Sequence, residues 1–303
     1  MTRVAAIDCG TNSIRLLIAD LGDDGTAQDV VRRMEIVRLG YGVDRTGRLD
    51  DAALDRTFAA CDAYAAQISE YGAERLRFVA TSATRDASNA ADFAAGVQER
   101  LGVAPDVASG AEEAALSFAG AARDLPDVDQ PVLVIDLGGG STELIVGRDG
   151  RAEGALSLDV GSVRMTERHL RDDPPTLGEI ESCAADVDAA LDGVELELGA
   201  VRTVVGVAGT ITTVAAAALD LAEYDSERIH HARLSVSRVR QVGAQILAAT
   251  VEQRRSWPYM HPGRADVIGG GALVLDRVLE RTGVAEMIVS EHDILDGIAW
   301  SLL

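Results

Sequence analysis

Two short glycine-containing stretches bring together residue types that bind phosphate and metal ions. The first reads IDCGTNSIR from residue 7, and the second reads IDLGGGSTE from residue 135. In each, an apolar run ends at an aspartate, a turn of glycine and hydroxyl residues follows, and an apolar run resumes. Glycine lets a ligand approach the backbone closely, and successive N–H groups with hydroxyls form an anion nest. The alternative for one such stretch alone is a tight hairpin whose aspartate bonds to its own turn.

The two stretches are copies of each other at an offset of 128 residues. Asp8 aligns with Asp136, and Arg15 aligns with Glu143, which has the opposite charge. Two aligned copies favour phosphate loops over isolated hairpins, with each aspartate placed where a hydrated Mg²⁺ bridges to phosphate. We expect Arg15 to grip phosphate and Glu143 to orient metal or water; the alternative is a pair of surface charges on strand edges.

A pair of glutamates near residue 112 offers a candidate general base. Ser109 and Glu112 have the spacing of a helix capping box, which explains Glu112 without any catalytic role. Glu113 is not needed for the cap and projects about 100° away around the helix. A carboxylate at a helix start that also meets phosphate can activate water. Glu113 is therefore our candidate base.

Three further segments could contact an oxyanion. Arg85 follows a run of hydroxyl residues after a strand, and arginine binds phosphate in a bidentate manner. The alternative for this segment is helix capping with an exposed arginine. Gly209 and Thr210 follow another strand and open a helix, where backbone N–H groups can meet an anion. Arg164 lies beside a glycine turn and is the weakest of these candidates.

Alternating strands and helices must position these residues. The expected strands are 4–7, 14–19, 30–39, 76–80, 103–108, 132–135, 144–146, 154–158, 203–207 and 287–290. The expected helices are 51–71, 89–101, 112–122, 163–170, 179–191, 211–218, 237–250, 265–281 and 293–302. The three glycines at 269–271 lie inside a helical pattern, which indicates close packing. Strand–helix alternation predicts an α/β fold.

The repeat and a linker rich in proline and aspartate divide the chain. The segment 123–131 reads as this linker. We therefore expect domains of like fold at 1–125 and 126–303, facing each other across a cleft. A C-terminal helix within 293–303 is expected to pack back on the first domain.

Composition and charge exclude several functions. The chain has 303 residues and a net charge of −21, which argues against binding nucleic acid or an anionic membrane surface. It contains no lysine, so neither a Walker A loop nor a Schiff base can form. Any cation that meets phosphate is thus an arginine or a metal ion. Scattered cysteines and the lack of a signal peptide indicate a cytoplasmic location. The five histidines lack ligand spacing, and we assign them no metal role.

Seven motifs, spread over nearly the whole chain, occur in the same order as in a known protein family. They are AAIDCGTNSIRLLIAD, ATSATRDASN, SGAEEAALSFAG, VIDLGGGSTELIVG, DVGSVRMTE, VGVAGTITT and GRADVIGGG. Together they resemble the exopolyphosphatase / guanosine pentaphosphate phosphohydrolase (Ppx/GppA) family in a short two-domain form. The resemblance implies two ribonuclease-H-like domains of the actin/Hsp70/sugar-kinase superfamily. It also implies stepwise hydrolysis of a terminal phosphoanhydride with Mg²⁺ or Mn²⁺.

Residue roles follow from the resemblance, motif by motif. Glu113, Asp136 and Glu143 are the implied catalytic residues, with Glu113 as the base. Asp8 joins Asp136 and Glu143 as an implied metal ligand. The implied phosphate-binding residues are Thr11, Asn12, Ser13, Arg15, Arg85, Gly138, Gly139, Gly140, Ser141, Thr142, Arg164, Gly209 and Thr210. The ending SEHDILDGIAW departs from the family pattern and leaves the role of residues 290–303 open.

The resemblance favours one substrate and leaves others open. We expect an exopolyphosphatase that prefers shorter chains, because longer relatives carry additional C-terminal helical domains. The alternatives are a pppGpp 5'-phosphohydrolase with the same chemistry, a non-catalytic polyphosphate or alarmone-binding protein, and an ATP-dependent kinase. A kinase would need an acceptor site and an adenosine pocket, and Glu113 argues for water as the nucleophile. The resemblance also implies a homodimer.

Overall fold

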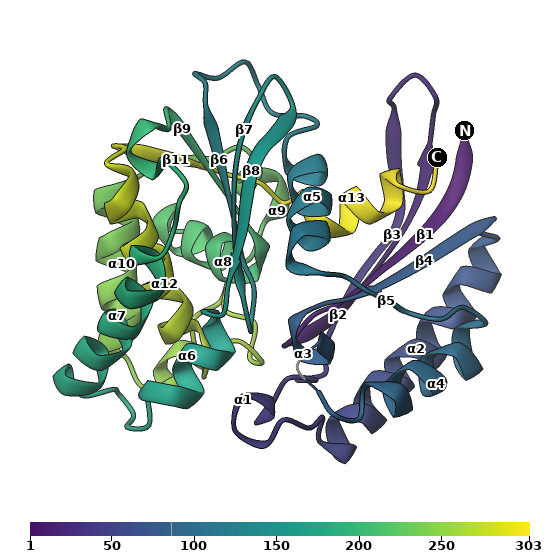
Figure 1. Cartoon of the computed structure of the whole chain (residues 1–303), viewed down its shortest axis with the longest axis horizontal. Coiled ribbons are helices and arrows are strands. Elements are labelled where there is room, and N and C mark those ends of the chain that lie inside the picture. The colour runs from purple at the N-terminus through teal and green to yellow at the C-terminus, as the bar shows by residue number, and fades with distance from the viewer. Residues whose placement is uncertain (86) are drawn as a thin grey trace. The chain divides into compact units, whose positions relative to one another are not determined.

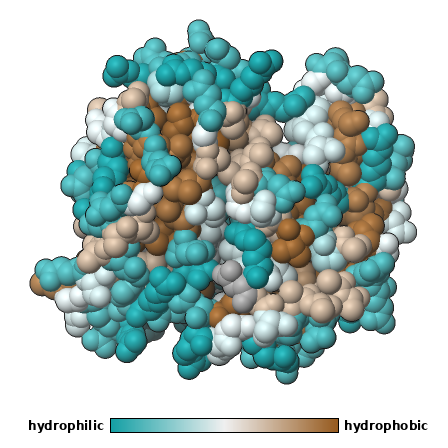
Figure 2. Space-filling model, in the orientation of Figure 1, coloured by the Kyte–Doolittle hydropathy of each residue, from teal (hydrophilic) through white to brown (hydrophobic). Residues whose placement is uncertain are grey.

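The computed structural model describes residues 1–85 and 87–303. They form two compact units, one of residues Met1–Gly120 with Ile294–Leu303 and one of residues Ala121–Asp293. Each unit is built around one β-sheet with helices packed on it (Figure 1). The α/β class expected from the alternation of strands and helices is confirmed. Hydrophilic residues cover much of the face in Figure 2, in keeping with the high net charge.

Unit 1 contains a five-stranded sheet in the order β3-β2-β1-β4-β5. Its strands are β1 (Thr2–Cys9), β2 (Ser13–Leu21), β3 (Ala27–Ile36), β4 (Arg75–Ala80) and β5 (Asp106–Val107). Its helices are α1 (Val43–Thr46), α2 (Asp51–Tyr71), α3 (Ser82–Arg85), α4 (Ala90–Leu101), α5 (Gly110–Ala121) and α13 (Ile294–Trp300). The first three strands are antiparallel neighbours, and β4 and β5 run parallel to β1.

Helices cover both faces of this sheet. Successive side chains of a strand point to opposite faces. Ala5 and Ile7 of β1 accordingly pack in one core with residues of α2 and α4. Val4 and Ala6 pack in the other core with α13 and the side chain of Leu116 in α5 (Figure 1). Strand β1 is thus buried on both sides, which holds rigidly the turn that follows it.

Unit 2 contains a six-stranded sheet in the order β10-β11-β9-β6-β7-β8. Its strands are β6 (Val132–Leu137), β7 (Thr142–Arg148), β8 (Arg151–Leu158), β9 (Thr203–Val207), β10 (Arg233–Ser235) and β11 (Glu286–Val289). Its helices are α6 (Ser162–His169), α7 (Leu177–Asp192), η1 (Leu198–Ala200), α8 (Ala208–Ala218), α9 (Ser226–Ile229), α10 (Val236–Ala248), α11 (Val251–Arg255) and α12 (Ile268–Thr282). Leu133, Ile135 and Leu137 of β6 pack in one core with residues of α7, α8, α10 and α12.

The repeat seen in the sequence is a repeat of topology. Strands β8-β7-β6-β9-β11 follow the same spatial order and directions as β3-β2-β1-β4-β5, with β10 added at the edge. The turns match as well. The N–H of Gly10 donates to the Ser13 carbonyl at 2.9 Å, and the N–H of Gly138 donates to the Ser141 carbonyl at 3.0 Å. Equivalent glycines therefore close equivalent turns at the end of the first strand of each unit.

Most expected elements occur close to their predicted bounds; the exceptions are two strands at sheet edges and the short helices α1, α3, α9 and α11, which were not predicted. Helix α2 has the predicted bounds; it starts at the Asp50 cap, which accepts from the Ala53 N–H, and ends at Gly72 in the left-handed conformation. The strand predicted at 103–108 is only Asp106–Val107, because it pairs only with Val79 and Ala80 of β4. The three-residue strand β10 was missed, since so short a segment carries no alternation.

The glycines at 269–271 pack closely, as predicted. A Cβ on Gly270 would lie 2.6 Å from the Thr166 Oγ1 atom and 2.8 Å from the Ser162 carbonyl oxygen, both in α6. A Cβ on Gly271 would lie 2.7 Å from Thr210 in α8. These glycines let α12 approach α6 and α8, whose first turns contain the candidate phosphate-binding residues Arg164, Gly209 and Thr210.

The divergent C-terminal segment has a structural role in unit 1. Asp296 in α13 pairs with Arg32 of β3, with an N–O distance of 2.5 Å. A Cβ on Gly297 would lie 1.9 Å from the carbonyl oxygen of Leu116 in α5, so the two helices touch at their backbones. The segment 294–303 therefore completes the core of a unit that otherwise ends at residue 120.

Candidate active site

The glycine loop of unit 2 joins β6 to β7 and is held by the start of α6. The Ser162 N–H donates to the Gly138 carbonyl at 3.0 Å, and the Val163 N–H donates to the Gly139 carbonyl at 2.8 Å. The carbonyls of the loop are thus turned toward α6. This pattern satisfies the first N–H groups of α6 within the protein, so the anion-binding capacity of this region lies in the loop itself.

Arg164 and Thr142 fasten this loop. The Nε atom of Arg164 donates to the Gly140 carbonyl at 2.7 Å, and its side chain is 12% exposed. The hydroxyl of Thr142 donates to the Val160 carbonyl at 2.6 Å. A Cβ on Gly161 would lie 2.6 Å from the Gly139 carbonyl. The structure therefore places Arg164 and Thr142 as supports of the predicted phosphate loop, while Ser141 is buried within it.

Asp136 and Glu143 are directly opposite each other on β6 and β7. They are 6% and 1% exposed, and the hydroxyl of Ser157 donates to Glu143 Oε1 at 2.7 Å. Carboxylates placed opposite one another on a sheet repel each other, and burial makes this repulsion more costly. A bound cation removes the conflict, and carboxylate oxygens suit Mg²⁺ or Mn²⁺. These residues are the described pair best suited to an oxygen-preferring metal.

The equivalent pair in unit 1 is neutralised by the protein itself. Asp8 and Arg15 are opposite each other on β1 and β2. The Nε and Nη2 atoms of Arg15 donate to Asp8 Oδ2 at 2.9 and 2.6 Å. Arg15 occupies the position in unit 1 that Glu143 occupies in unit 2. The pair in unit 1 therefore combines a negative and a positive charge, whereas the pair in unit 2 combines two negative charges. Arg15 thus faces Asp8, which was predicted as a metal ligand.

The remaining candidates on the first turn of unit 1 lie beside α3. The hydroxyls of Thr11 and Ser82 are 2.9 Å apart. The Thr11 carbonyl accepts from the Gly40 N–H at 2.8 Å, and the Asn12 carbonyl accepts from the Arg38 N–H at 2.9 Å. Ser13 is the first residue of β2. The turn that carries these predicted phosphate ligands is therefore braced on both sides by neighbouring loops.

Glu113 is a buried carboxylate with one arginine partner. It is 7% exposed, and its Oε2 atom lies 2.7 Å from Nη1 of Arg85. The same Arg85 nitrogen donates to the Ala108 carbonyl at 2.6 Å, which fixes the guanidinium. Burial raises the pKa of Glu113 and the charge of Asp8 adds to the rise, while Arg85 and the Thr81 hydroxyl oppose it. A carboxylate with a raised pKa is suited to take a proton near neutral pH.

Glu112 serves the cap, as its spacing predicts. Its Oε2 atom accepts from the N–H and the hydroxyl of Ser109, both at 2.9 Å, and Ser109 Oγ accepts from the Glu112 N–H at 3.3 Å. Glu112 is exposed, whereas Glu113 beside it is buried. Of these two adjacent glutamates, Glu112 caps the helix and Glu113 is left for another role.

Gly209 and Thr210 lie in the first turn of α8, where Arg264 approaches them. Nη1 of Arg264 donates to the Gly209 carbonyl and to Thr213 Oγ1, both at 3.3 Å. A Cβ on Gly209 would lie 2.4 Å from Cζ of Arg264. Sequence reasoning missed Arg264 as a candidate cation. Arg264 is the arginine of the GRADVIGGG motif, and this motif could have identified it as a candidate.

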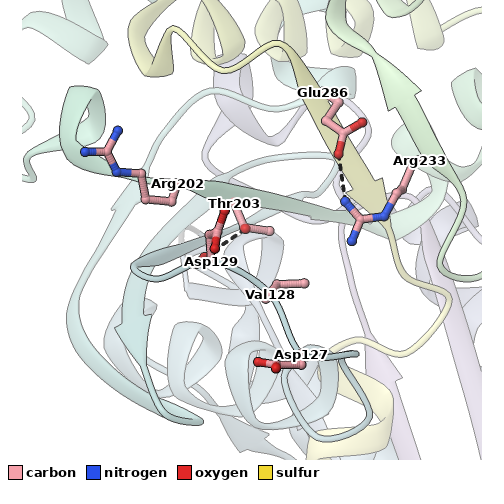
Figure 3. Close-up of a pocket in the computed structure, with 7 residues that line it drawn as sticks. All are labelled: Asp127, Val128, Asp129, Arg202, Thr203, Arg233 and Glu286. Carbon is pink, nitrogen blue, oxygen red and sulfur yellow. Dashed lines mark hydrogen bonds and ion pairs between the residues drawn. The ribbon is translucent and has the colours of Figure 1, made fainter.

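A cavity in unit 2 lies away from the glycine loop. It has a volume of about 280 Å³. It is lined by Asp127, Val128, Asp129, Arg202, Thr203, Arg233 and Glu286 (Figure 3). Thr203 and Glu286 begin β9 and β11, whereas the glycine loop follows the end of the parallel strand β6. Arg233 is paired with Glu286 at 2.7 Å, and three carboxylates face two arginines, so the lining does not favour a polyanion.

Comparison with known proteins identifies the family. The chain belongs to the Ppx/GppA phosphatase family, whose profile matches residues 17–303. It is 48% identical to Exopolyphosphatase 2 of Mycobacterium tuberculosis over 318 aligned residues, covering all of this chain and 99% of that protein. A crystal structure of an exopolyphosphatase-like protein matches with a TM-score of 0.96 and 45% identity, covering 99% of this chain and 97% of that one. The resemblance recognised in the motifs is confirmed.

A second relative carries a different activity in its name. The guanosine-5'-triphosphate,3'-diphosphate pyrophosphatase of Vibrio cholerae is 29% identical over 302 residues. The match covers 99% of this chain but only 59% of that protein. The chain thus corresponds end to end with an exopolyphosphatase and to part of the pyrophosphatase. None of the described helices combines the length and apolar character needed to cross a membrane.

Proposed function

We propose that this protein is an exopolyphosphatase, which releases terminal orthophosphate from inorganic polyphosphate by metal-dependent hydrolysis. The observation that carries the proposal is the buried Glu113, paired with Arg85 at 2.7 Å, in a chain that aligns end to end with an exopolyphosphatase. In the reaction, the oxygen of water bonds to the terminal phosphorus and the bridging P–O bond breaks. Glu113 takes the proton from the attacking water.

Arginines and backbone N–H groups bind the substrate in this proposal. Arg85 holds Glu113 in its deprotonated form and contacts the terminal phosphate. The loop Gly138–Thr142 offers N–H groups to phosphate oxygens, with Gly140 held in place by Arg164. Without lysine, these arginines and a divalent cation must balance the substrate charge.

Asp136 and Glu143 would hold Mg²⁺ or Mn²⁺. Such an ion stabilises charge that develops on phosphate oxygens. The support for this assignment is the buried, like-charged pair across β6 and β7. Asp8, already paired with Arg15, is a weaker ligand in this proposal. We also propose a preference for short chains, a homodimer and a cytoplasmic location; three buried, free cysteines agree with a reducing compartment.

Hydrolysis of pppGpp at its 5' end is the second candidate. It uses the same chemistry, and the observation that favours it is the similarity to the Vibrio cholerae pyrophosphatase. The end-to-end match to an exopolyphosphatase makes polyphosphate the first choice. A protein that only binds polyphosphate would have no use for a buried base beside an arginine, since burying that carboxylate destabilises the fold.

The decisive experiment compares Glu113→Gln with its neighbour Glu112→Gln. Phosphate release would be measured from short and long polyphosphate, pppGpp and ATP, with Mg²⁺ or Mn²⁺ and with chelator. We expect Glu113→Gln to lower kcat by about 10²–10⁴-fold with substrate binding kept, and Glu112→Gln to remain active. Full activity in Glu113→Gln would disprove the mechanism, and faster turnover of pppGpp than of polyphosphate would favour the second candidate.

A further inference from the structure

Three of the five histidines meet around one carboxylate, although they are far apart in the sequence. Asp124 follows α5, His230 and His231 follow α9, and His292 follows β11. Asp124 Oδ2 lies 3.0 Å from Nε2 of His230 and 2.9 Å from Nδ1 of His292. Donor atoms of Asp124, His230 and His292 all lie within 4.8 Å of one another. This His/Asp cluster lies wholly in unit 2 and shares no residue with the candidate active site.

We propose that this cluster binds a zinc-class transition-metal ion. Zn²⁺ takes imidazole nitrogen and carboxylate oxygen at about 2.0–2.2 Å in a tetrahedral arrangement, which separates its ligand atoms by roughly 3.3 Å. The two nitrogen–oxygen distances around Asp124 are within a few tenths of an ångström of this spacing. A small outward shift suffices for these two pairs, while the nitrogens of His230 and His292, which lie within 4.8 Å of each other, must reach the same spacing. Imidazole donors select Zn²⁺, Co²⁺ or Ni²⁺ over Mg²⁺, which prefers oxygen.

His231 is a fourth donor at the edge of the His/Asp cluster. Its ring stacks on that of His230 with centroids 3.7 Å apart, and its Nε2 atom lies 3.7 Å from Asp124 Oδ1. Among the described residues this buried nitrogen makes no hydrogen bond. A buried polar atom without a hydrogen bond indicates an unoccupied bonding direction. His231 also has a φ of 60°, an uncommon backbone conformation for a non-glycine residue, held where its ring faces Asp124.

Neighbouring groups position the ligands. The hydroxyl of Ser290 accepts from the His292 N–H at 3.0 Å and donates to the His292 carbonyl at 2.9 Å. The Glu291 N–H donates to Nδ1 of His230 at 3.2 Å, so neutral His230 carries its proton on Nε2 and gives it to Asp124. When an ion binds Nε2, the proton moves from Nε2 to Nδ1, so Nδ1 can no longer accept from the Glu291 N–H and this 3.2 Å hydrogen bond breaks. The two Ser290 contacts remain in place when an ion binds, and outer contacts of this kind orient metal ligands.

The position of the His/Asp cluster indicates what an ion would do. Asp124 lies four residues after unit 1 ends at Gly120, and His292 lies two residues before the chain returns to unit 1 at Ile294. An ion bound by both residues and by His230 joins these two segments to the turn between α9 and β10. We therefore expect the metal to stabilise unit 2. The His292 side chain is 39% exposed, which leaves a path for the ion.

The test titrates the purified full chain with Zn²⁺ by calorimetry and with Co²⁺ by absorption, in wild type, His230→Ala and His292→Ala. His169→Ala is the matched control, because His169 pairs with a single carboxylate, Asp186, at 2.8 Å. Wild type and His169→Ala should bind one ion per chain with tetrahedral Co²⁺ bands. Each alanine variant of the His/Asp cluster should bind more than about 100-fold more weakly, since even loss of an outer partner costs 10–100-fold.

Thermal unfolding provides a second measurement. Zn²⁺ should raise the Tm of wild type and of His169→Ala but not that of the two variants, because a ligand stabilises only the state that binds it. Mg²⁺, which we propose to bind at Asp136 and Glu143, should change the Tm of all four proteins by the same amount. The proposal is overturned if wild type binds no Zn²⁺, if His230→Ala and His292→Ala bind as tightly as His169→Ala, or if Mg²⁺ competes equally. None of these outcomes depends on phosphatase activity, so the proposed function is tested separately.

Discussion

At the scale of single residues, neighbours in the sequence have different chemistry because their surroundings differ. Glu112 is exposed and completes a helix cap, whereas Glu113 is buried against Arg85. The cross-strand pairs differ in the same way. Asp8 faces the cation Arg15, while Asp136 faces the carboxylate of Glu143. Charge and burial, more than residue type, distinguish a candidate base and metal pair from structural carboxylates.

Replacement of Arg85 tests the electrostatics of the base. Burial raises the pKa of Glu113, and Arg85 opposes this rise, so Arg85→Gln should raise the pKa further. The base acts in its deprotonated form, and activity is lost as the pH falls through this pKa. We therefore expect the acid limb of the pH profile of kcat/KM to move to higher pH, with lower activity at neutral pH.

Arg77→Gln is the control for this prediction, because Arg77 lies on the strand before Arg85 and pairs with the exposed Asp106. Its pH profile should match that of wild type. An acid limb that stays in place in Arg85→Gln would mean that Glu113 is not the titrating base.

At the scale of elements, helix starts hold the loops that carry the candidate ligands. The first turn of α6 binds the carbonyls of the glycine loop, and Gly161 lets the two approach. Arg264 similarly contacts the first turn of α8. Rigid strands place each turn, and the next helix sets its orientation. Preorganised donors of this kind do not have to reorder when charge develops on the substrate.

Gly161→Ala tests this support of the loop. Gly161 has an extended φ of −154°, which any residue adopts, so the effect of alanine is steric. Its Cβ would lie 2.6–2.8 Å from backbone atoms of Gly139 and Gly140 and must displace the loop. We expect turnover to fall about 100-fold, as for a displacement near 1 Å, while the circular dichroism spectrum stays unchanged.

Gly178→Ala provides the comparison, since a Cβ there meets nothing within 4 Å. That variant should keep wild-type turnover, measured as phosphate release from polyphosphate. Equal activity of the two alanine variants would show that the position of the loop does not matter for the reaction.

At the scale of the whole molecule, the C-terminal segment completes the core of the unit that the N-terminal part of the chain forms. Unit 1 is built from residues 1–120 and 294–303, so its core depends on the last segment of the chain.

The protein carries a net charge of −21, while the proposed substrate is a polyanion. The arginines and a divalent cation must therefore act locally, and activity should depend on that cation.

Removal of residues 294–303 tests the contribution of α13. The deletion exposes the core around Ile294, Leu295 and Ile298. Burial of such side chains contributes about 1.5–3 kcal/mol each, and a whole domain is stable by only about 5–15 kcal/mol. We expect unit 1 to lose hydrogen-exchange protection in β1 and β4.

A shorter deletion of residues 301–303 leaves α13 intact and serves as the control, with protection close to that of wild type. Full protection of unit 1 without residues 294–303 would contradict the structural role of the divergent C-terminus.

The sequence by itself determined the features that depend on a few neighbouring residues. These are the paired glycine turns, the α/β alternation, the bounds of α2 and the cap at Glu112, because local hydrogen bonds and side-chain periodicity specify them. Only the tertiary structure decided which distant residues meet. Arg85 contacts Glu113, which lies 28 residues away in the sequence, Arg264 contacts Gly209, and Asp124 lies close to three histidines. Such contacts depend on how whole elements pack, and no spacing along the chain encodes that packing.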